Sequence, residues 1–360
     1  MPKQYFTLMK KKSKKKIIIK ILLIIVLLLV VAAGIVANSM YKRIFEPNVL
    51  VGGTESVYVY ISSSGNFESL KDSLYYHNFV ANKPSFEWVA ERKGLPRSIK
   101  PGRYEIVPNM NNNELVNLLR SGKQAPIKLT FNNIRTKEQF AGRMAEKFEF
   151  DSIELITFLY DVDFLKQYQK TLETAMTLFI PNTYLIYWNI TAKDFIARMK
   201  KEHDAFWTEK RSNFAKEMGL TKEEVVTLAS IVQEETNKND EKQRVAGVYV
   251  NRLKSNWLLQ ADPTLKFALG DFTIRRVLSE HKELESPYNT YKYTGLPPGP
   301  ICMPDISSID AVLNYEHHNY YYFCAKDDMS GYHVFENSLS KHNINAQKYH
   351  NALNRAKIYR

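Results

Sequence analysis

Glu235 is the residue of this sequence whose position most directly suggests chemistry. It lies near the end of the segment Thr221–Thr236, where Thr221 and Glu224 have the spacing of a capping box that begins a helix. The apolar residues that follow recur at helical spacing and define a buried face: Val225, Leu228, Ala229 and Val232. At about 100° per residue, Glu235 lies about 20° from Leu228, inside this apolar stripe.

A carboxyl group held against apolar surface is hard to ionise, so its pKa should rise. A carboxylic acid that stays protonated near neutral pH is what a general acid for glycosidic-bond cleavage needs. Gln233 and Glu234 fall well off the stripe, which favours Glu235 as the acid. The alternative is that Glu235 only marks the frayed end of the helix, where the stripe no longer has meaning.

Polar and aromatic residues suited to a sugar follow Glu235 in the chain. A pyranose has a polar rim and an apolar face, so it needs amides, carboxylates and aromatic rings together. The substrate-binding candidates are Asn251, Gln260, Asp262, Asn289 and Tyr291. Each has a structural alternative, because an acidic residue before proline often caps a helix and many of the 22 tyrosines must pack. His333 and His342 could act as acid or base, although structural hydrogen bonds are their more common use.

The segment offers one well-placed carboxylate and no second one at helical spacing. Classical glycosidases use two carboxylates. The missing partner favours a mechanism in which the substrate supplies its own nucleophile. In a muramic sugar the C6 hydroxyl can attack C1 and leave an anhydro ring. Glu235 would then act first as acid and later as base.

The N-terminus predicts a membrane anchor. Residues 1–50 carry nine Lys, one Arg and one Glu, which is a net charge of +9 out of +12 for the whole chain. The positive charge is therefore concentrated in an N-terminal tail, which can bind anionic lipid headgroups. We expect no nucleic-acid partner. The tail, 1–16, precedes an apolar segment, 17–38, of about the length that spans a bilayer. The Lys cluster predicts a cytoplasmic N-terminus and an extracytoplasmic body in the plasma membrane. A cleaved signal peptide is the competing interpretation.

The remaining chain predicts an α+β protein with two folded parts after a linker, 39–55. Residues 56–125 should form a small module and residues 126–360 a larger mixed domain, with Glu235 at the end of a helix. For the small module we expect strands 57–61 and 103–107 and helices 67–76, 85–92 and 111–120. For the large domain we expect strands 127–131, 320–325 and 332–335 and helices 136–148, 191–214, 221–236, 239–257 and 343–358.

Metal or cofactor chemistry is not expected, because Cys302 and Cys324 are the only cysteines and no clustered Cys/His spacing is present. In an exported domain the two cysteines could form a disulfide or remain buried thiols. The sequence leaves both readings open.

Ordered motifs over about 120 residues carry a family resemblance. They are Leu228–Thr236, Val250–Leu253, Leu259–Thr264, Tyr288–Tyr291, Thr294–Ile301, Gly331–Phe335 and His342–Asn343. With them the chain resembles the MltG (YceG-like) endolytic peptidoglycan transglycosylases. The resemblance implies that Glu235 is the catalytic acid/base, that the small module is LysM-like, and that no cofactor is needed.

The resemblance also implies a reaction. Such an enzyme cuts MurNAc–GlcNAc bonds within nascent glycan strands, leaves 1,6-anhydroMurNAc ends and so terminates strand elongation, with penicillin-binding synthases as candidate partners. The sequence departs from the family pattern at three places. Gln233 replaces a glutamate of some relatives, Asn182 replaces an aspartate of many relatives, and Met176-Thr177 replace a glutamate-glycine pair that is often present.

Two other functions fit the same residues. One is a non-catalytic, membrane-anchored protein that binds peptidoglycan as a scaffold. The other is a conventional hydrolase that recruits Asp262 as its second carboxylate.

Overall fold

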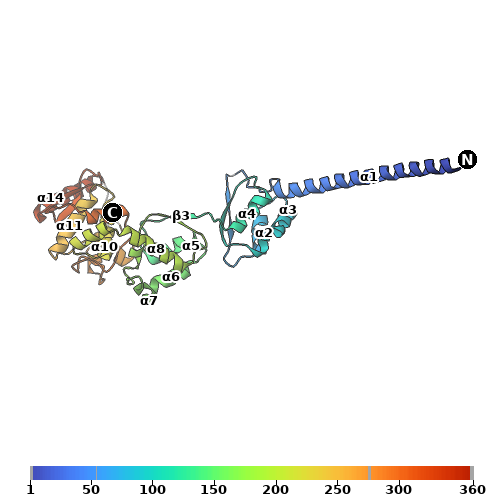
Figure 1. The fold of residues 1–360 in the computed structure, drawn as a ribbon. Helices are drawn as coiled ribbons and strands as arrows, with labels where there is room; N and C mark the ends of the chain where they lie inside the picture. The colour runs from blue at the N-terminus through green and yellow to red at the C-terminus, as the bar shows by residue number, and fades with distance from the viewer. Residues whose placement is uncertain (1–2, 54, 275–276, 357–360) are drawn as a thin grey trace. The chain divides into compact units, whose positions relative to one another are not determined.

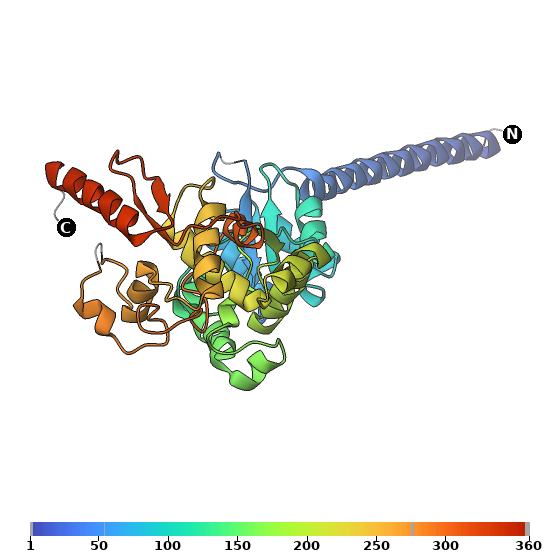
Figure 2. The ribbon, with the colours of Figure 1, turned by 90° about the vertical axis from the view of Figure 1, so that its left-hand side faces the viewer.

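The computed structural model describes residues 3–53, 55–274 and 277–356, with side chains from Lys15 onward, and it divides the chain into Met1–Pro126 and Ile127–Arg360 (Figures 1 and 2). Each unit has a hydrophobic core of its own. The two units mix helices with short antiparallel sheets, and each of the described sheets has two strands. The fold is therefore α+β, as the sequence predicts.

The first unit begins with one long helix, α1 (Lys3–Phe45), which is drawn in blue in Figure 1. Its part from Lys15 to Phe45 has a mean hydropathy of 3.2 and is long and apolar enough to cross a membrane. The helix continues past the predicted span of 17–38 into the segment expected to be a linker. There, Pro47 and Val49 make bridges with Asn111 and Val80, and Val49 is buried in the core of the unit.

The small module is built from a two-stranded sheet and three helices. They are β1 (Val57–Ile61), α2 (Phe67–Tyr76), α3 (Lys83–Arg92), the 3-10 turn η1 (Leu95–Arg97), β2 (Gly102–Ile106) and α4 (Asn112–Ser121). Capping boxes at Asn66 and Asn111 start α2 and α4. Gly122, with φ +74°, ends α4 in the left-handed conformation. All five predicted elements of this module are present within two residues of the predicted bounds.

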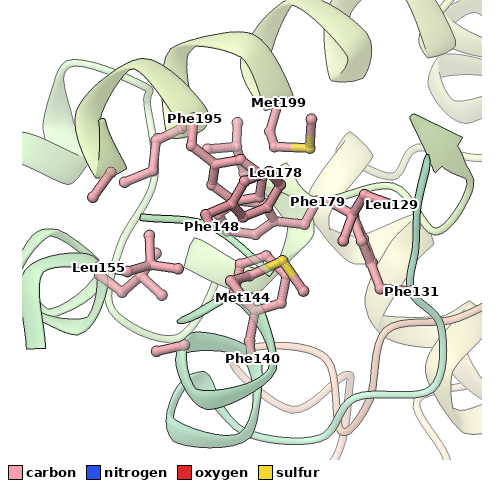
Figure 3. Packing of buried hydrophobic residues seen from close by; sticks show 14 of the residues in the cluster. Leu129, Phe131, Phe140, Met144, Phe148, Leu155, Leu178, Phe179, Phe195 and Met199 are labelled. Atoms are coloured by element: carbon pink, nitrogen blue, oxygen red, sulfur yellow. The ribbon is translucent and has the colours of Figure 1, made fainter. Parts of the chain in front are cut away.

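The first half of the second unit packs around phenylalanine rings. Its elements are β3 (Ile127–Thr130), α5 (Lys137–Ala145), α6 (Ser152–Tyr160), α7 (Val162–Lys166), η2 (Ala175–Leu178), β4 (Thr183–Ile186) and α8 (Ala192–Phe206). Phe140, Phe179 and Phe195 meet at centroid distances of 4.4–6.3 Å, and Met144 and Leu178 close the cluster (Figure 3). The antiparallel pair β3–β4 closes one side of this core.

The predicted helix 191–214 is wrong as one helix. It breaks at Trp207, and α9 (Glu209–Glu217) starts anew because the Thr208 side chain accepts a hydrogen bond from the backbone N–H of Arg211. Helices α6 and α7 were not predicted at all.

The second half of the unit places Glu235. Its elements are α10 (Lys222–Glu235), α11 (Lys242–Lys254), α12 (Asp262–Leu269), η3 (Glu280–Glu283), α13 (Ile306–Leu313), β5 (Tyr322–Ala325), β6 (His333–Glu336) and α14 (Leu339–Arg355). Helix α10 is central, because α9, α11, α12 and α13 all pack on it. Residues 357 and 358 of the predicted last helix lie outside the described residues, and α12 and α13 were not predicted. Cys302 is buried, Cys324 is half-buried, and both are free thiols.

A substitution at Gly247 tests how closely α11 packs against the chain before β5. A Cβ added at this residue would lie 2.4 Å from the carbonyl oxygen of Glu316 and 2.6 Å from Nε2 of His318. We therefore expect Gly247→Ala to lower the free energy of unfolding by about 1–3 kcal/mol, although Ala is the better helix former. Urea denaturation followed by tryptophan fluorescence measures this change.

Gly142→Ala is the matched control. Gly142 lies in α5, and nothing lies within 4 Å of an added Cβ there. This variant should gain about 0.5–1 kcal/mol. If both variants change stability equally, steric contact does not fix α11.

Candidate active site

Glu235 is the last residue of a helix that is held firmly at both ends. At its start, the backbone N–H of Thr221 donates to Glu224 at 2.7 Å and the Glu224 N–H donates back to the threonine hydroxyl at 3.2 Å. Every residue from Val225 to Val232 is buried. At its end, the buried Thr236 keeps a backbone bond to Val232 O, and its hydroxyl accepts from the N–H of Lys238 at 3.0 Å. The helix end is therefore not frayed.

The carboxyl group of Glu235 has a pKa raised to about 7. Burial is the largest cause, because it disfavours the charged form, and the charge of Asp262 adds to it. The phenol of Tyr249 opposes the rise, since it donates a 2.7 Å hydrogen bond to Oε1 that favours the carboxylate. The cations Arg252 and Lys266 oppose it as well. Near neutral pH this group exchanges its proton readily.

Tyr249 reaches Glu235 from α11. Its side chain is almost completely buried, and its ring meets Phe323 of β5 edge-on at 5.9 Å. Burial, and then the neighbouring Glu235 charge, raise the pKa of the phenol well above its usual value. Tyr249 therefore stays a neutral donor whether Glu235 is charged or not.

Asp262 and Tyr291 join this cluster. Asp262 begins α12 on the exposed surface and accepts a 2.5 Å hydrogen bond from the hydroxyl of the half-buried Tyr291. Burial and the Asp262 partner raise the pKa of the Tyr291 phenol. The charge of Asp262 also reaches Glu235, as its effect on the pKa of that group shows. The structure thus brings three of the predicted site residues together.

Gln260 and Asn289 lie in the two segments that hold this pair. Gln260 is exposed, has a left-handed φ of +51°, and donates its N–H to Thr290 O at 3.0 Å. Asn289 is fully buried, and its Nδ2 donates to the carbonyls of Lys282 and Leu284 while its Oδ1 accepts from the N–H of Tyr291. Gln260 can face a ligand, whereas Asn289 orders the loop that carries Tyr291.

Asn251 lies elsewhere. It is two residues after Tyr249, so its side chain leaves α11 about 200° around the helix. Its Nδ2 donates to the carbonyls of His318 and Tyr320, each at 2.9 Å. Asn251 therefore joins α11 to the chain before β5 and does not face Glu235.

Sequence reasoning missed Tyr249 and Lys266 as neighbours of Glu235, and it grouped Arg252 with Asn251 as a polar pair on the next helix. Arg252 is buried and donates to the carbonyls of Leu259 at 2.6 Å and Tyr321 at 2.8 Å, which fixes the chain just before Gln260. Their spacing could have revealed them. Tyr249 and Arg252 follow Val245 on one face of α11, and a polar group on a buried face needs a hydrogen-bond partner.

A half-buried carboxylic acid with a pKa near neutrality, a phenol donor and a nearby second carboxylate define a site for proton transfer. The chain belongs to the YceG-like family, whose model matches residues 59–348. It is 28% identical over 324 residues to the endolytic murein transglycosylase of Bacillus subtilis (strain 168), a match that covers 86% of this chain and 88% of that protein.

Two further relatives agree with this assignment. The chain is 27% identical to the endolytic murein transglycosylase of Streptococcus pneumoniae serotype 2 (strain D39), which it matches over 82% of its own length and 59% of the relative's. Among solved structures, it is similar to a YceG-like protein from Listeria monocytogenes, with a TM-score of 0.56 and 27% identity over 81% of this chain and 98% of the other.

Protonation of Glu235 should be visible in stability. Its pKa is about 7 in the folded protein against a usual value of 4.5. Between these two pH values the folded state holds a proton that the unfolded chain has lost, so stability falls as the pH rises through this window and then levels off. Glu235→Gln removes this loss. We expect the variant to be more stable than the natural protein by about 1–3 kcal/mol at about pH 8.

The measurement is urea unfolding of both proteins at several pH values. The stability difference should shrink steadily as the pH falls toward the usual glutamate pKa. A difference that does not vary with pH would mean that Glu235 is already ionised in the folded protein.

Proposed function

We propose that this chain is a membrane-anchored lytic transglycosylase that cuts within peptidoglycan strands. The observation that carries the proposal is the Glu235 carboxyl, which is half-buried, has a pKa of about 7 and is bonded to Tyr249. Membership of the YceG-like family and the names of the relatives from Bacillus and Streptococcus support the same reaction.

The proposed mechanism uses Glu235 twice. Its proton passes to the glycosidic oxygen as the bond from that oxygen to C1 of N-acetylmuramic acid breaks. The resulting carboxylate then takes the proton of the C6 hydroxyl while O6 bonds to C1. The products are a free 4-hydroxyl on N-acetylglucosamine and a 1,6-anhydro-N-acetylmuramic end, and no water is consumed. Glu235 regains its proton, so the cycle needs no further reagent.

The remaining site residues would position the sugar. Asp262 and Tyr291 present a carboxylate and an aromatic ring near Glu235, and Gln260 presents an exposed amide two residues before Asp262. Asn289 would act through Tyr291, because its amide is used inside the loop. Asn251 would act only by holding α11 in place.

The N-terminal part of the chain would hold this site near its substrate. We propose that α1 is retained as a single-pass anchor with a cytoplasmic N-terminus and an extracytoplasmic body, and that the module after it is LysM-like and binds glycan. Cleavage near the membrane would shorten nascent strands and terminate their elongation. Penicillin-binding synthases that make these strands are then the natural partners.

Product analysis tests the reaction. We expect the full-length protein to convert peptidoglycan into fragments with anhydro ends, each lighter by one water molecule than a hydrolysis product, as mass spectrometry measures. We expect Glu235→Gln to lower the rate by at least about 10³-fold, because the reaction loses its only acid and base. Ends that contain added water would support the hydrolase, and glycan binding without cleavage would support the scaffold.

The pH dependence of the rate tests the site more finely. Cleavage needs the protonated acid, so the rate should fall as the pH rises above about 7. Tyr249→Phe removes a donor that favours the carboxylate, and the falling limb should move to higher pH. Asp262→Asn removes a charge that raises the pKa, and the limb should move to lower pH. Shifts in the same direction would contradict this electrostatic account.

Tyr184→Phe is the matched control for this profile. Tyr184 is also buried, and its hydroxyl donates to the carbonyl of Ile180. It is not among the groups with the largest effects on the pKa of Glu235. Its profile should keep the natural midpoint.

A further inference from the structure

A polar cleft lies beside the last turn of α10. Its volume is about 440 Å³, and it is walled by the chain after β3, by Gln233 and Glu234, and by the segment between α10 and α11. Glu234 lines this cleft, while the next residue, Glu235, faces Tyr249. Successive side chains leave a helix about 100° apart. The cleft and the Glu235 carboxyl therefore lie on neighbouring faces of the last turn of α10.

Asparagine amides dominate the wall of this cleft. Asn132 and Asn133 follow β3, and Asn237 and Asn239 follow α10. All four are exposed, and within the described residues none has a hydrogen bond from its side chain. A primary amide offers two donors and an acceptor. Four such groups around one cleft can bind a chain that itself alternates donors and acceptors.

Charges of both signs complete the wall. Arg135 donates to Glu234 at 2.8 Å, and Lys242 donates to the hydroxyl of Ser307 at 3.0 Å. Asp305 adds a second carboxylate. A smaller hollow of about 100 Å³ shares Arg135 and Glu234 with the cleft and adds Lys266 and the ring of Phe272, over which the Arg135 guanidinium lies. Glu234, which lines both the cleft and the hollow, directly precedes Glu235, and Lys266 of the hollow acts on the Glu235 carboxyl through its charge.

The composition of the wall fits a peptide better than a sugar. Among the described residues that line the cleft there is no aromatic ring, and a pyranose face would need one. The rings near Glu235 belong instead to Tyr249 and Tyr291. An uncharged polysaccharide carries no charged groups that could pair with these cations and carboxylates. A peptidoglycan stem peptide has backbone amides, free carboxylates and, on its diamino acid, an ammonium group.

We propose that this cleft binds the stem peptide carried by the muramic sugar at the cleavage point. The inference rests on the proposed glycan substrate. In such a strand every second sugar carries the lactyl group to which a peptide is joined. A peptide seated in the cleft would therefore place a muramic sugar, and not its neighbour, next to Glu235. Strands that carry peptides should bind more tightly than strands from which the peptides have been removed.

The test compares binding of two glycan oligomers, one with stem peptides and one stripped by an amidase. Full-length protein carrying Glu235→Gln is used so that neither oligomer is cut, and dissociation constants are measured by calorimetry. We expect the peptide-bearing oligomer to bind about tenfold more tightly, the effect of one or two net hydrogen bonds. Adding Asn132→Ala and Asn239→Ala should remove most of this preference.

Asn213→Ala is the matched control, because Asn213 is an exposed asparagine on α9 that does not line the cleft. It should keep the preference. Equal binding of the two oligomers, or a preference that survives the double change at Asn132 and Asn239, overturns the inference.

Cleavage of the two oligomers by the natural protein separates this inference from the proposed function. Cleavage with no binding preference overturns the peptide site and leaves the transglycosylase standing. A tenfold preference with no cleavage overturns the transglycosylase and supports the peptide site.

Discussion

The balance of forces on the Glu235 carboxyl is the constraint on which the site depends. Burial disfavours its charged form, while the hydrogen bond from Tyr249 and the charges of Arg252 and Lys266 favour it. Burial is the largest effect, and the opposing groups limit the rise, so that the pKa settles at about 7 instead of its usual 4.5. Complete burial without a donor would hold the proton too tightly to give it away. Full exposure would leave an ordinary carboxylate with no proton to give.

This balance requires that α10 be fixed, and three successive side chains at its end show how. The Oε1 of Gln233 accepts from the N–H of Asp305 at 2.6 Å and from the hydroxyl of Ser308 at 3.0 Å, which binds the start of α13. Glu234 pairs with Arg135 in the chain after β3. Glu235 is left to face α11. The uncharged Gln233 supplies the acceptor that α13 needs without placing a further negative charge beside the acid.

Helix α10, which carries Glu235, could be predicted from the sequence, because the signals that define it lie within its own segment. The capping box at Thr221 and the apolar stripe are properties of a single segment, and both are present in the structure. Tyr249 could not be found this way, since it is one of 22 tyrosines and its partner lies on another helix. Asn251 was predicted beside the sugar because it lies near in sequence, but the helix directs it to the opposite side. Local pattern predicts the element, whereas the facing partner depends on how elements pack.

The same distinction explains the errors in the fold. Helix α12 was not predicted because its start contains a proline, yet Pro263 lies in the first turn, where its missing N–H costs nothing. The break at Trp207 is hidden because Thr208 can cap a helix or continue one, and the burial of Trp207 decides between them.

Asp262 shows how one acid would suffice in the proposed mechanism. Its carboxylate is exposed at the start of α12 and accepts the Tyr291 hydroxyl, so it is held in place by a neutral donor. From there its charge raises the pKa of Glu235 and keeps the proton on that acid. A second carboxylate that acts through its charge needs no contact with the reacting carbon. In the proposed mechanism the sugar's own C6 hydroxyl is then free to be the nucleophile, and the site has to transfer only a single proton.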